Sequence, residues 1–263
     1  MKPIVLFRGS LAETGELEIA RKYFSVYEHR TLCQKNDFVI CRYSYLPYAK
    51  ELEDDLISLG CKIINSYSQH RWVANFDYYE EVKKYTPETW FDDNFYMAKE
   101  GKYIVKGRTN SRKHQWKTKM LSNNKSDALR IASELLNDDP MIGEQGIIFR
   151  KYIPLKTYEI GMNGLPFTDE YRFFFYKTKE LCHGYYWGIA ENTSHKISEE
   201  GIKFAHKLAE KVARHVNFFV LDVAQTESGE WILIEINDGQ QSGLSLCDPD
   251  ELYFNLKKEL ESV

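Results

Sequence analysis

Two acidic residues near the C-terminus are placed to bind a divalent metal ion. Residues 218–237, FFVLDVAQTESGEWILIEIN, are typical of two strands joined by a two-residue turn at Ser228-Gly229, where glycine supplies a positive φ. Counting outward from that turn pairs Asp222 with Glu235. Because side chains alternate along a strand, Asn237 should lie on the same face as both carboxylates. Two carboxylates and an amide oxygen suit a hard cation, and so few protein ligands favour Mg²⁺, which keeps positions open for phosphate.

The two faces of this hairpin differ in polarity. The alternation puts Leu233 on the face of the carboxylates, whereas Ile232 and Ile234 fall on an opposite, wholly apolar face. Carboxylates facing each other at roughly 5 Å repel, so either a shared proton or a cation should neutralise them. The alternative stays open that Asp222 only hydrogen-bonds backbone at a strand end while Glu235 reaches solvent.

The hairpin resembles the C-terminal magnesium motif of ATP-grasp enzymes. In that motif an Asp, a Glu and an Asn two residues after the Glu bind the ions that bridge the ATP phosphates. The resemblance implies that Asp222, Glu235 and Asn237 bind Mg²⁺ and that ATP and Mg²⁺ are the cofactors. It also implies an α/β ATP-grasp fold. A small N-terminal α/β domain over 1–66 would precede two subdomains, over 67–150 and 151–263, that clasp ATP between them.

Three further segments extend the resemblance. YIVKG resembles the strand whose lysine touches the nucleotide phosphates, which implies that role for Lys106. IIFRKYI resembles the linker at the adenine, and DEYRFFF resembles the family's Asp-x-Arg strand. The second of these puts Glu170 at the ribose and Arg172 at phosphate or the developing acyl phosphate. The adenine linker implicates Lys151, Tyr152 and Ile153, partly through their backbone groups.

The sequence departs from the family pattern at two places. Phe76 stands near the position of an earlier phosphate-binding lysine, so that lysine is missing or supplied from elsewhere. The loop that covers the phosphates is usually rich in glycine, but residues 107–119 read GRTNSRKHQWKTK. Their basic side chains could clamp triphosphate or an anionic substrate, with Lys113 as a catalytic candidate, or could form an ordinary solvated charge run. The basic residues of the segment are Arg108, Arg112, Lys113, Lys117 and Lys119.

The elements around these residues follow an α/β pattern. The strands PIVLFRG and DFVICRY, with a helix between residues 46 and 60 and then CKIIN, predict a parallel β-α-β unit. Further helices are expected over FDYYEEVKKY, after a cap at Ser126, over 198–216 with Ser198 as cap, and from about Pro249. The apolar positions expected to face inward are Leu52, Leu56 and Leu59 in the first helix, and Leu129, Ala132 and Leu136 in the one after Ser126. The Thr86-Pro87 dipeptide suggests a domain junction.

Composition restricts the class of protein. With 43% hydrophobic residues and a net charge of −4, the 263-residue chain should form a globular protein, and one that does not coat nucleic acid. Five scattered cysteines lack CxxC spacing and suggest reduced structural thiols. No apolar run approaches the ~18 residues of a membrane span, so we expect no signal peptide, no membrane anchor and a cytoplasmic location.

The favoured function is ATP-dependent ligation. The resemblance implies a ligase that joins a small-molecule or peptide carboxylate to an amine through an acyl phosphate. Three rivals stay open: a kinase that uses the same ATP site, a nucleic-acid-binding or repair protein that uses residues 107–119, and a catalytically silent nucleotide-binding module. Of the seven histidines, His114 and His183 fall in segments that the resemblance places near the site, and neither has a partner at metal-ligand spacing.

Overall fold

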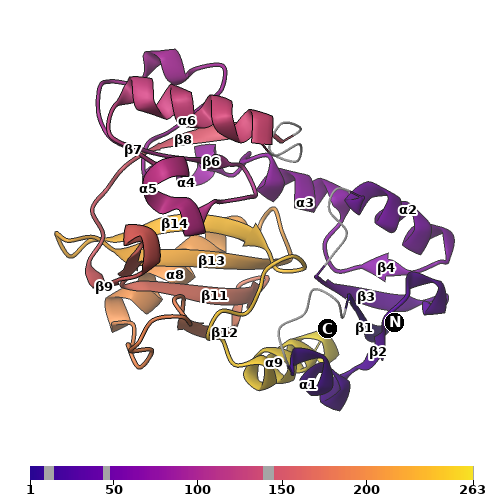
Figure 1. The fold of residues 1–263 in the computed structure, drawn as a ribbon. Helices are drawn as coiled ribbons and strands as arrows, with labels where there is room; N and C mark the ends of the chain where they lie inside the picture. The colour runs from indigo at the N-terminus through magenta and orange to yellow at the C-terminus, as the bar shows by residue number, and fades with distance from the viewer. Residues whose placement is uncertain (9–14, 44–47, 139–144, 263) are drawn as a thin grey trace.

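The computed structural model describes residues 1–8, 15–43, 48–138 and 145–262, arranged as three main sheets with helices on their faces (Figure 1). The N-terminal sheet has the order β2-β1-β3-β4, and all its pairings are parallel. Its strands are β1 Lys2–Phe7, β2 Ser25–Tyr27, β3 Asp37–Arg42 and β4 Lys62–Ile63. The helices are α1 Glu16–Tyr23 and α2 Ala49–Ser58, with a 3₁₀ turn, η2, at Arg30–Leu32. The predicted parallel β-α-β unit is confirmed.

The second sheet is antiparallel and has the order β5-β8-β6-β7. It comprises β5 Thr89–Phe91, β6 Tyr103–Gly107, β7 Leu121–Ser122 and β8 Ile147–Lys151, and α6 Lys125–Asp138 covers it (Figure 1). Short elements surround it: α3 Tyr67–Ala74, α4 Tyr79–Val82, η3 Phe95–Met97, η4 Lys113–Gln115 and α5 Trp116–Lys119. The helix expected over FDYYEEVKKY is therefore only one turn long, and α3 just before it was not predicted.

The buried faces of two helices differ from the predicted ones. In α6 the side chain of Asn124, not Ser126, caps the first turn by accepting from the Asp127 N–H at 2.8 Å. Leu129 and Leu136 are 53% and 43% exposed, so their predicted inward position is wrong. The stripe that meets the sheet is Ala128, Ile131, Ala132 and Leu135, which has the i, i+3, i+4, i+7 spacing of a helix face. In α2, Leu52 and Leu56 are buried as predicted, but Leu59 follows the last turn and is 38% exposed.

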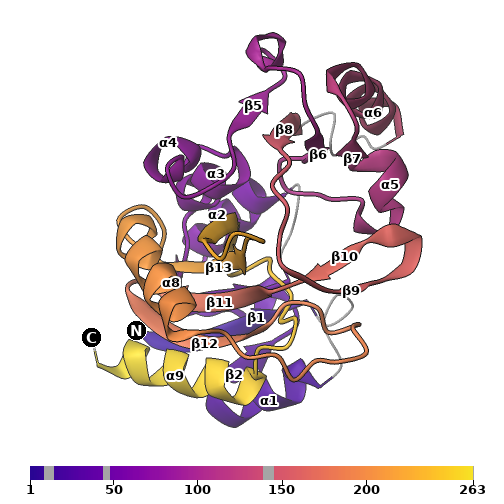
Figure 2. The ribbon, with the colours of Figure 1, turned by 90° about the vertical axis from the view of Figure 1, so that its left-hand side faces the viewer.

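The third sheet is also antiparallel and has the order β12-β11-β13-β14. Its strands are β11 Glu170–Tyr176, β12 Lys179–Tyr185, β13 Phe218–Gln225 and β14 Trp231–Asp238. The helix α8 Glu199–Val212 packs on one face, with Ser198 as its predicted cap. The other face meets the N-terminal sheet through a core that includes α9 Pro249–Glu261, which runs beside α1 (Figure 2). A small hairpin of β9 Thr157–Ile160 and β10 Pro166–Thr168, with η5 Met162–Gly164 between them, stands beside this sheet.

In the β13–β14 hairpin the turn and a bulge each shift the predicted register by one residue, in opposite directions. The turn is one residue longer than predicted, since Thr226 accepts the Gly229 N–H and donates its own N–H to Glu230, while Gly229 has φ +90°. A bulge at Ile234 then restores the count, so Asp222 pairs with Glu235 as predicted. Leu233, however, pairs with Val223 and lies in the apolar core, and Ile232 and Ile234 line a cleft. The predicted faces of these three residues are therefore wrong.

Candidate active site

A first cavity lies between the second and third sheets and is mostly apolar. Seven of the ten residues singled out from the sequence line it. They are Lys106, Lys113, Lys151, Tyr152, Ile153, Glu170 and Glu235. The apolar part of its lining includes Ile104, Trp116, Met120, Leu165, Trp187, Ile232 and Ile234. Such a surface suits a flat ring system, with polar groups at one end to orient it.

A second, more polar cavity adjoins the first. The two share Lys106, Ser111, Lys113 and Glu235 in their linings. Arg172 and Asn237 line only the second one, together with α3 and residues 241–243. The cationic and acidic side chains thus gather where an apolar compartment meets a polar one.

One row of charged residues crosses the third sheet at this junction. Arg172 on β11 pairs in register with Asp222 on β13, which pairs with Glu235 on β14. Arg172 donates to both oxygens of Asp222, at 2.8 and 2.7 Å, and to the carbonyl of Gly243 at 2.7 Å. Lys106 reaches across from β6 and forms an ion pair with Glu235. Asp222 itself lines neither cavity and is 1% exposed.

Protein cations neutralise the two opposed carboxylates. The sequence predicted a shared proton or a metal ion for this purpose. In the structure, Arg172 forms an ion pair with Asp222, and Lys106 forms one with Glu235. Burial by itself raises the pKa of Glu235, and the ammonium of Lys106 more than offsets this, so the pKa is lowered. The protein without ligand therefore carries compensated charge at this row, and the predicted like-charge strain is wrong.

Lys113 from the basic segment points into the cleft. Its Nζ lies 2.5 Å from the hydroxyl of Tyr186 and 5.0 Å from the ring centroid of Trp187. Burial alone would lower the pKa of Lys113, but Tyr186 and Glu170 outweigh it and raise the pKa. Arg108 instead donates to the carbonyl of Asn75 at 3.1 Å, and Lys119 pairs with Asp138. The basic side chains of this segment therefore diverge, and of the five only Lys113 lines either cavity.

The adenine-linker residues differ in what their backbones can still bind. The N–H groups of Lys151 and Tyr152 donate to the carbonyls of Glu88 and Lys102, at 2.8 and 2.9 Å. For Ile153, no main-chain hydrogen bond is found within the described part of the chain. Ile153 lines the first cavity, and its unpaired peptide groups favour it as a backbone contact for a base edge.

Comparison with known proteins decides the family. The sequence profile of the ATP-grasp domain, R2K clade family 3, matches residues 92–256. The chain belongs to this family. Similar solved structures include the D-cycloserine synthetase DcsG, with 12% identity, TM-score 0.61 and coverage of 98% of this chain and 99% of that one. No protein with a curated description matches.

Two further solved structures were determined with nucleotide. D-alanine–D-alanine ligase from Bacillus anthracis, complexed with ATP, has 11% identity and a TM-score of 0.52, with 98% of each chain covered. The ATP-grasp ligase PsnB, complexed with a phosphomimetic variant of minimal precursor, Mg and ADP, has 12% identity and a TM-score of 0.54, again with 98% of each chain covered. At such identities these likenesses show a shared fold.

The predicted ATP-grasp family and α/β fold are thus confirmed. As a protein of the ATP-grasp family, it has ATP and Mg²⁺ as its cofactors. Within the described residues no helix combines the length and apolar character needed to cross a bilayer. All five cysteines are buried free thiols.

The charged row of this ATP-grasp enzyme fits a magnesium ion. Glu235 and Asn237 present hard oxygen donors to the second cavity, and the Asn237 amide lies 3.3 Å from Asp222. Among the described residues no group of three or more His, Cys, Asp or Glu side chains could hold a metal by itself. Phosphate oxygens and water molecules would supply the remaining ligands of Mg²⁺.

Several residues of the cleft escaped the sequence analysis. Arg150 sits one position before the predicted Lys151, is buried, and donates to the carbonyl of Ile234 and the hydroxyl of Thr86. Tyr186 and His70, which line the second cavity, were not predicted either. The adjacent RK pair was the one local signal for Arg150. His183, by contrast, bonds to Glu180 at 2.7 Å and lines neither cavity, and nor does His114.

Glu170 should make stability depend on pH. Burial raises the pKa of this carboxyl from 4.5 to about 7, with Lys113 opposing the rise. The pKa of Glu170 is higher in the folded protein than in the unfolded one. Its contribution to the free energy of unfolding is therefore full below pH ~4.5 and is lost as the pH rises through ~7. Between these limits wild type should lose roughly 3 kcal/mol relative to Glu170→Gln. Urea melts of both proteins from pH 4.5 to 7.5 measure the difference, and parallel curves would contradict it.

Proposed function

We propose that the protein joins a carboxylate to an amine, forming a carbon–nitrogen bond with release of ADP and phosphate. The observation that carries the proposal is the junction of the two cavities at Lys106, Lys113 and Glu235. A nucleotide in the apolar cavity would present its terminal phosphate at that junction. A carboxylate in the polar cavity would then meet the phosphate beside Arg172.

The residues at the junction are proposed to have different roles, according to their chemistry. Glu235 and Asn237, with Asp222 behind them, are proposed to hold Mg²⁺, which offsets charge on the phosphates when bound. Lys106 and Lys113 bring positive charge to the transferring phosphoryl group, and Arg172 orients the carboxylate or its acyl phosphate. Glu170 is proposed at the ribose, and Lys151, Tyr152 and Ile153 at the base. In the protein without ligand Lys106 is paired with Glu235, and a bound Mg²⁺ would compete with that ion pair.

The structure of the basic segment favours this proposal over nucleic-acid binding. A nucleic-acid surface needs several cations exposed on one face, because it binds a row of phosphates. Here Lys113 is turned into the cleft, and Arg108 packs 5.3 Å from the ring centroid of Phe91. The similar solved structures named as ligases and a synthetase support ligation over a kinase outcome.

Product analysis tests the proposal. The protein is incubated with Mg-ATP, pooled amino acids and short peptides, and hydroxylamine, which traps an acyl phosphate as a hydroxamate. We expect ADP, phosphate and a hydroxamate, and a new amide when hydroxylamine is omitted. A phosphorylated acceptor without hydroxamate would identify a kinase, and the absence of any ATP turnover would favour a silent module.

Lys106→Met should weaken nucleotide binding while the protein stays folded. Lys106 is 8% exposed and Met fills a similar volume, but the variant leaves Glu235 without its cationic partner, so a modest loss of stability should accompany the loss of affinity. Removing one charge-assisted contact to phosphate should raise the Kd for Mg-ATP by roughly 10-fold or more. Calorimetry measures it, with Lys102→Met on the exposed start of the same strand region as control. Unchanged affinity with a much lower Tm would make Lys106 structural.

A further inference from the structure

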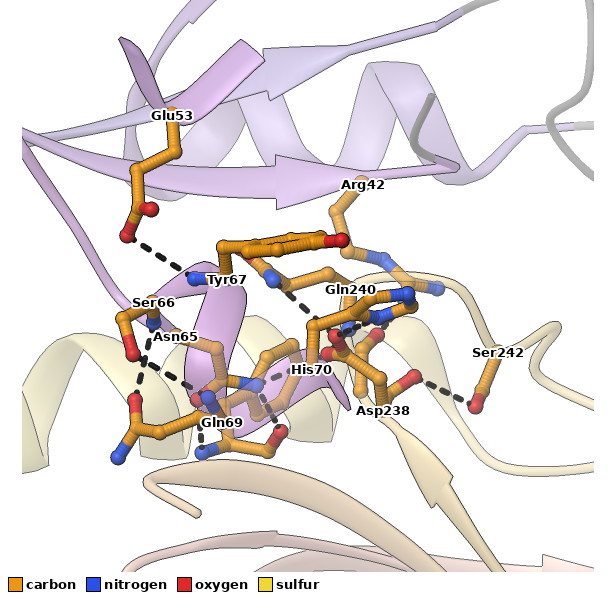
Figure 3. A network of polar contacts seen from close by, with 12 residues as sticks. Arg42, Glu53, Asn65, Ser66, Tyr67, Gln69, His70, Asp238, Gln240 and Ser242 are labelled. Atoms are coloured by element: carbon orange, nitrogen blue, oxygen red, sulfur yellow. Dashed lines mark hydrogen bonds and ion pairs between the residues drawn. The ribbon is translucent and has the colours of Figure 1, made fainter. Parts of the chain in front are cut away.

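A buried histidine lies in the wall of the second cavity and has no role in the function proposed so far. His70, on α3, is 6% exposed and lines this cavity together with Arg172 and Asn237. Its Nδ1 lies 2.9 Å from Oδ2 of Asp238, the residue directly after Asn237 (Figure 3). The contact joins positions 168 residues apart in the chain.

The surroundings of Asp238 fix which ring nitrogen carries hydrogen. Its Oδ1 accepts from the Asn65 amide and from the backbone N–H of Gln240, both at 2.9 Å, and Oδ2 also accepts from the Gln240 amide at 3.3 Å (Figure 3). The carboxylate is 3% exposed and acts only as an acceptor. His70 must therefore donate through Nδ1, which leaves Nε2 of the neutral ring with its lone pair. No hydrogen-bond partner of Nε2 is found among the described residues.

The other groups of the second cavity do not supply a free base. Lys106, Lys113 and Arg172 are cations, Glu235 is paired with Lys106, and the hydroxyl of Tyr186 is bonded to Lys113. Asp238 also lines the cavity, but its carboxylate is already bonded to His70, Asn65 and Gln240. The remaining polar side chains of the described lining are hydroxyls and amides: Thr109, Asn110, Ser111, Gln241 and Ser242, besides Asn237. A ring nitrogen held in one tautomer by a buried carboxylate is the arrangement expected of a general base.

We propose that His70 is the base that activates the amine in the second half of the reaction, and that Asp238 positions its ring. This inference rests on the proposed ligase function. The attacking amine arrives as an ammonium ion, which has no lone pair until one proton moves to Nε2 of His70. The amine nitrogen then forms a bond to the acyl carbon, the bond from that carbon to the phosphate oxygen breaks, and the phosphate takes the second proton. His70 afterwards returns its proton to solvent.

If His70 is the base, its replacement should slow the reaction of a protonated amine much more than that of an unprotonated one. Hydroxylamine is largely unprotonated at neutral pH and needs little help, whereas an alkylamine such as methylamine is almost wholly protonated, like a lysine side chain with its pKa of ~10.4. His70→Asn removes Nε2 but keeps an N–H donor near the position of Nδ1 for Asp238. In the presence of Mg-ATP and the amino-acid pool, this variant should form hydroxamate within about twofold of wild type. It should form the methylamide at least about 100-fold more slowly.

Control variants distinguish a catalytic role of His70 from a purely structural one. Ser66→Ala removes the cap of α3, which holds His70, without touching the cavity, so it should lower Tm while leaving the ratio of methylamide to hydroxamate unchanged. If His70→Asn does not fold, His70→Gln, which conserves more of the side-chain volume, takes its place. Equal loss of both products, or of neither, would overturn the role of His70, because a structural or carboxylate-binding residue would affect acyl phosphate formation too. If wild type gives no hydroxamate with any acid, the proposed function fails and this inference with it.

Discussion

Glu235→Gln is expected to lower the rate of ATP-dependent product formation by at least about 100-fold. The amide keeps the shape of the side chain but removes one of the two negative charges proposed to hold Mg²⁺ at the junction of the cavities. Charge on the transferring phosphoryl group is then poorly compensated. Phosphate release measures the effect, and Mg-ATP should correspondingly raise the Tm of the variant much less than that of wild type.

The same substitution should also weaken the protein without ligand. From the sequence alone, deleting one of two opposed charges is expected to leave stability unchanged or to raise it. The ion pair between Glu235 and Lys106 reverses that expectation, because the variant leaves Lys106 without its anionic partner. We expect a loss of about 1–3 kcal/mol in the free energy of unfolding. Glu227→Gln, on the exposed turn of the same hairpin, is the control and should change neither quantity. Normal turnover in Glu235→Gln would show that Glu235 is not needed to bind the metal.

Arg172→Met is expected to be the most destabilising substitution at the site. Asp222 is 1% exposed, and Arg172 donates to both of its oxygens, so the variant leaves a buried carboxylate without its cation. Breaking a buried pair in this way costs about 3–5 kcal/mol. Urea unfolding at neutral pH measures the loss, and Arg21→Met, which removes an exposed surface arginine, should cost less than ~1 kcal/mol.

A double variant separates stability from activity at this pair. Arg172→Met combined with Asp222→Asn has no unpaired buried charge, so it should recover much of the lost stability. Its activity should be no higher than that of Arg172→Met, because the guanidinium proposed to orient the carboxylate is still missing and Asp222→Asn removes a carboxylate proposed to help hold Mg²⁺. Recovery of both quantities together would mean that Arg172 acts only by holding Asp222.

Local patterns were sufficient for the elements that carry the site. Alternation and turn signals predicted the β13 and β14 strands and the pairing of Asp222 with Glu235, although the longer turn and the bulge at Ile234 had to cancel. The family motifs brought out Lys106, Glu170 and Arg172, all of which lie in the cleft. The roles of Lys106, Glu170 and Arg172 follow from the resemblance to the family, whereas the pairing of Asp222 with Glu235 rests on residues close together in the chain. Short-range geometry of that kind is encoded by residue type and spacing.

Only the tertiary structure decided which charged groups meet. Lys106 pairs with Glu235 over 129 positions, and His70 bonds to Asp238 over 168. No periodicity reports such contacts, because they depend on how the second sheet and α3 pack against the third sheet. Packing likewise selected Ala128 and Leu135 instead of Leu129 and Leu136 for the buried face of α6. The sequence by itself therefore determined which strands carry the acidic and cationic residues of the site, and the packing of three sheets decided how their charges are compensated.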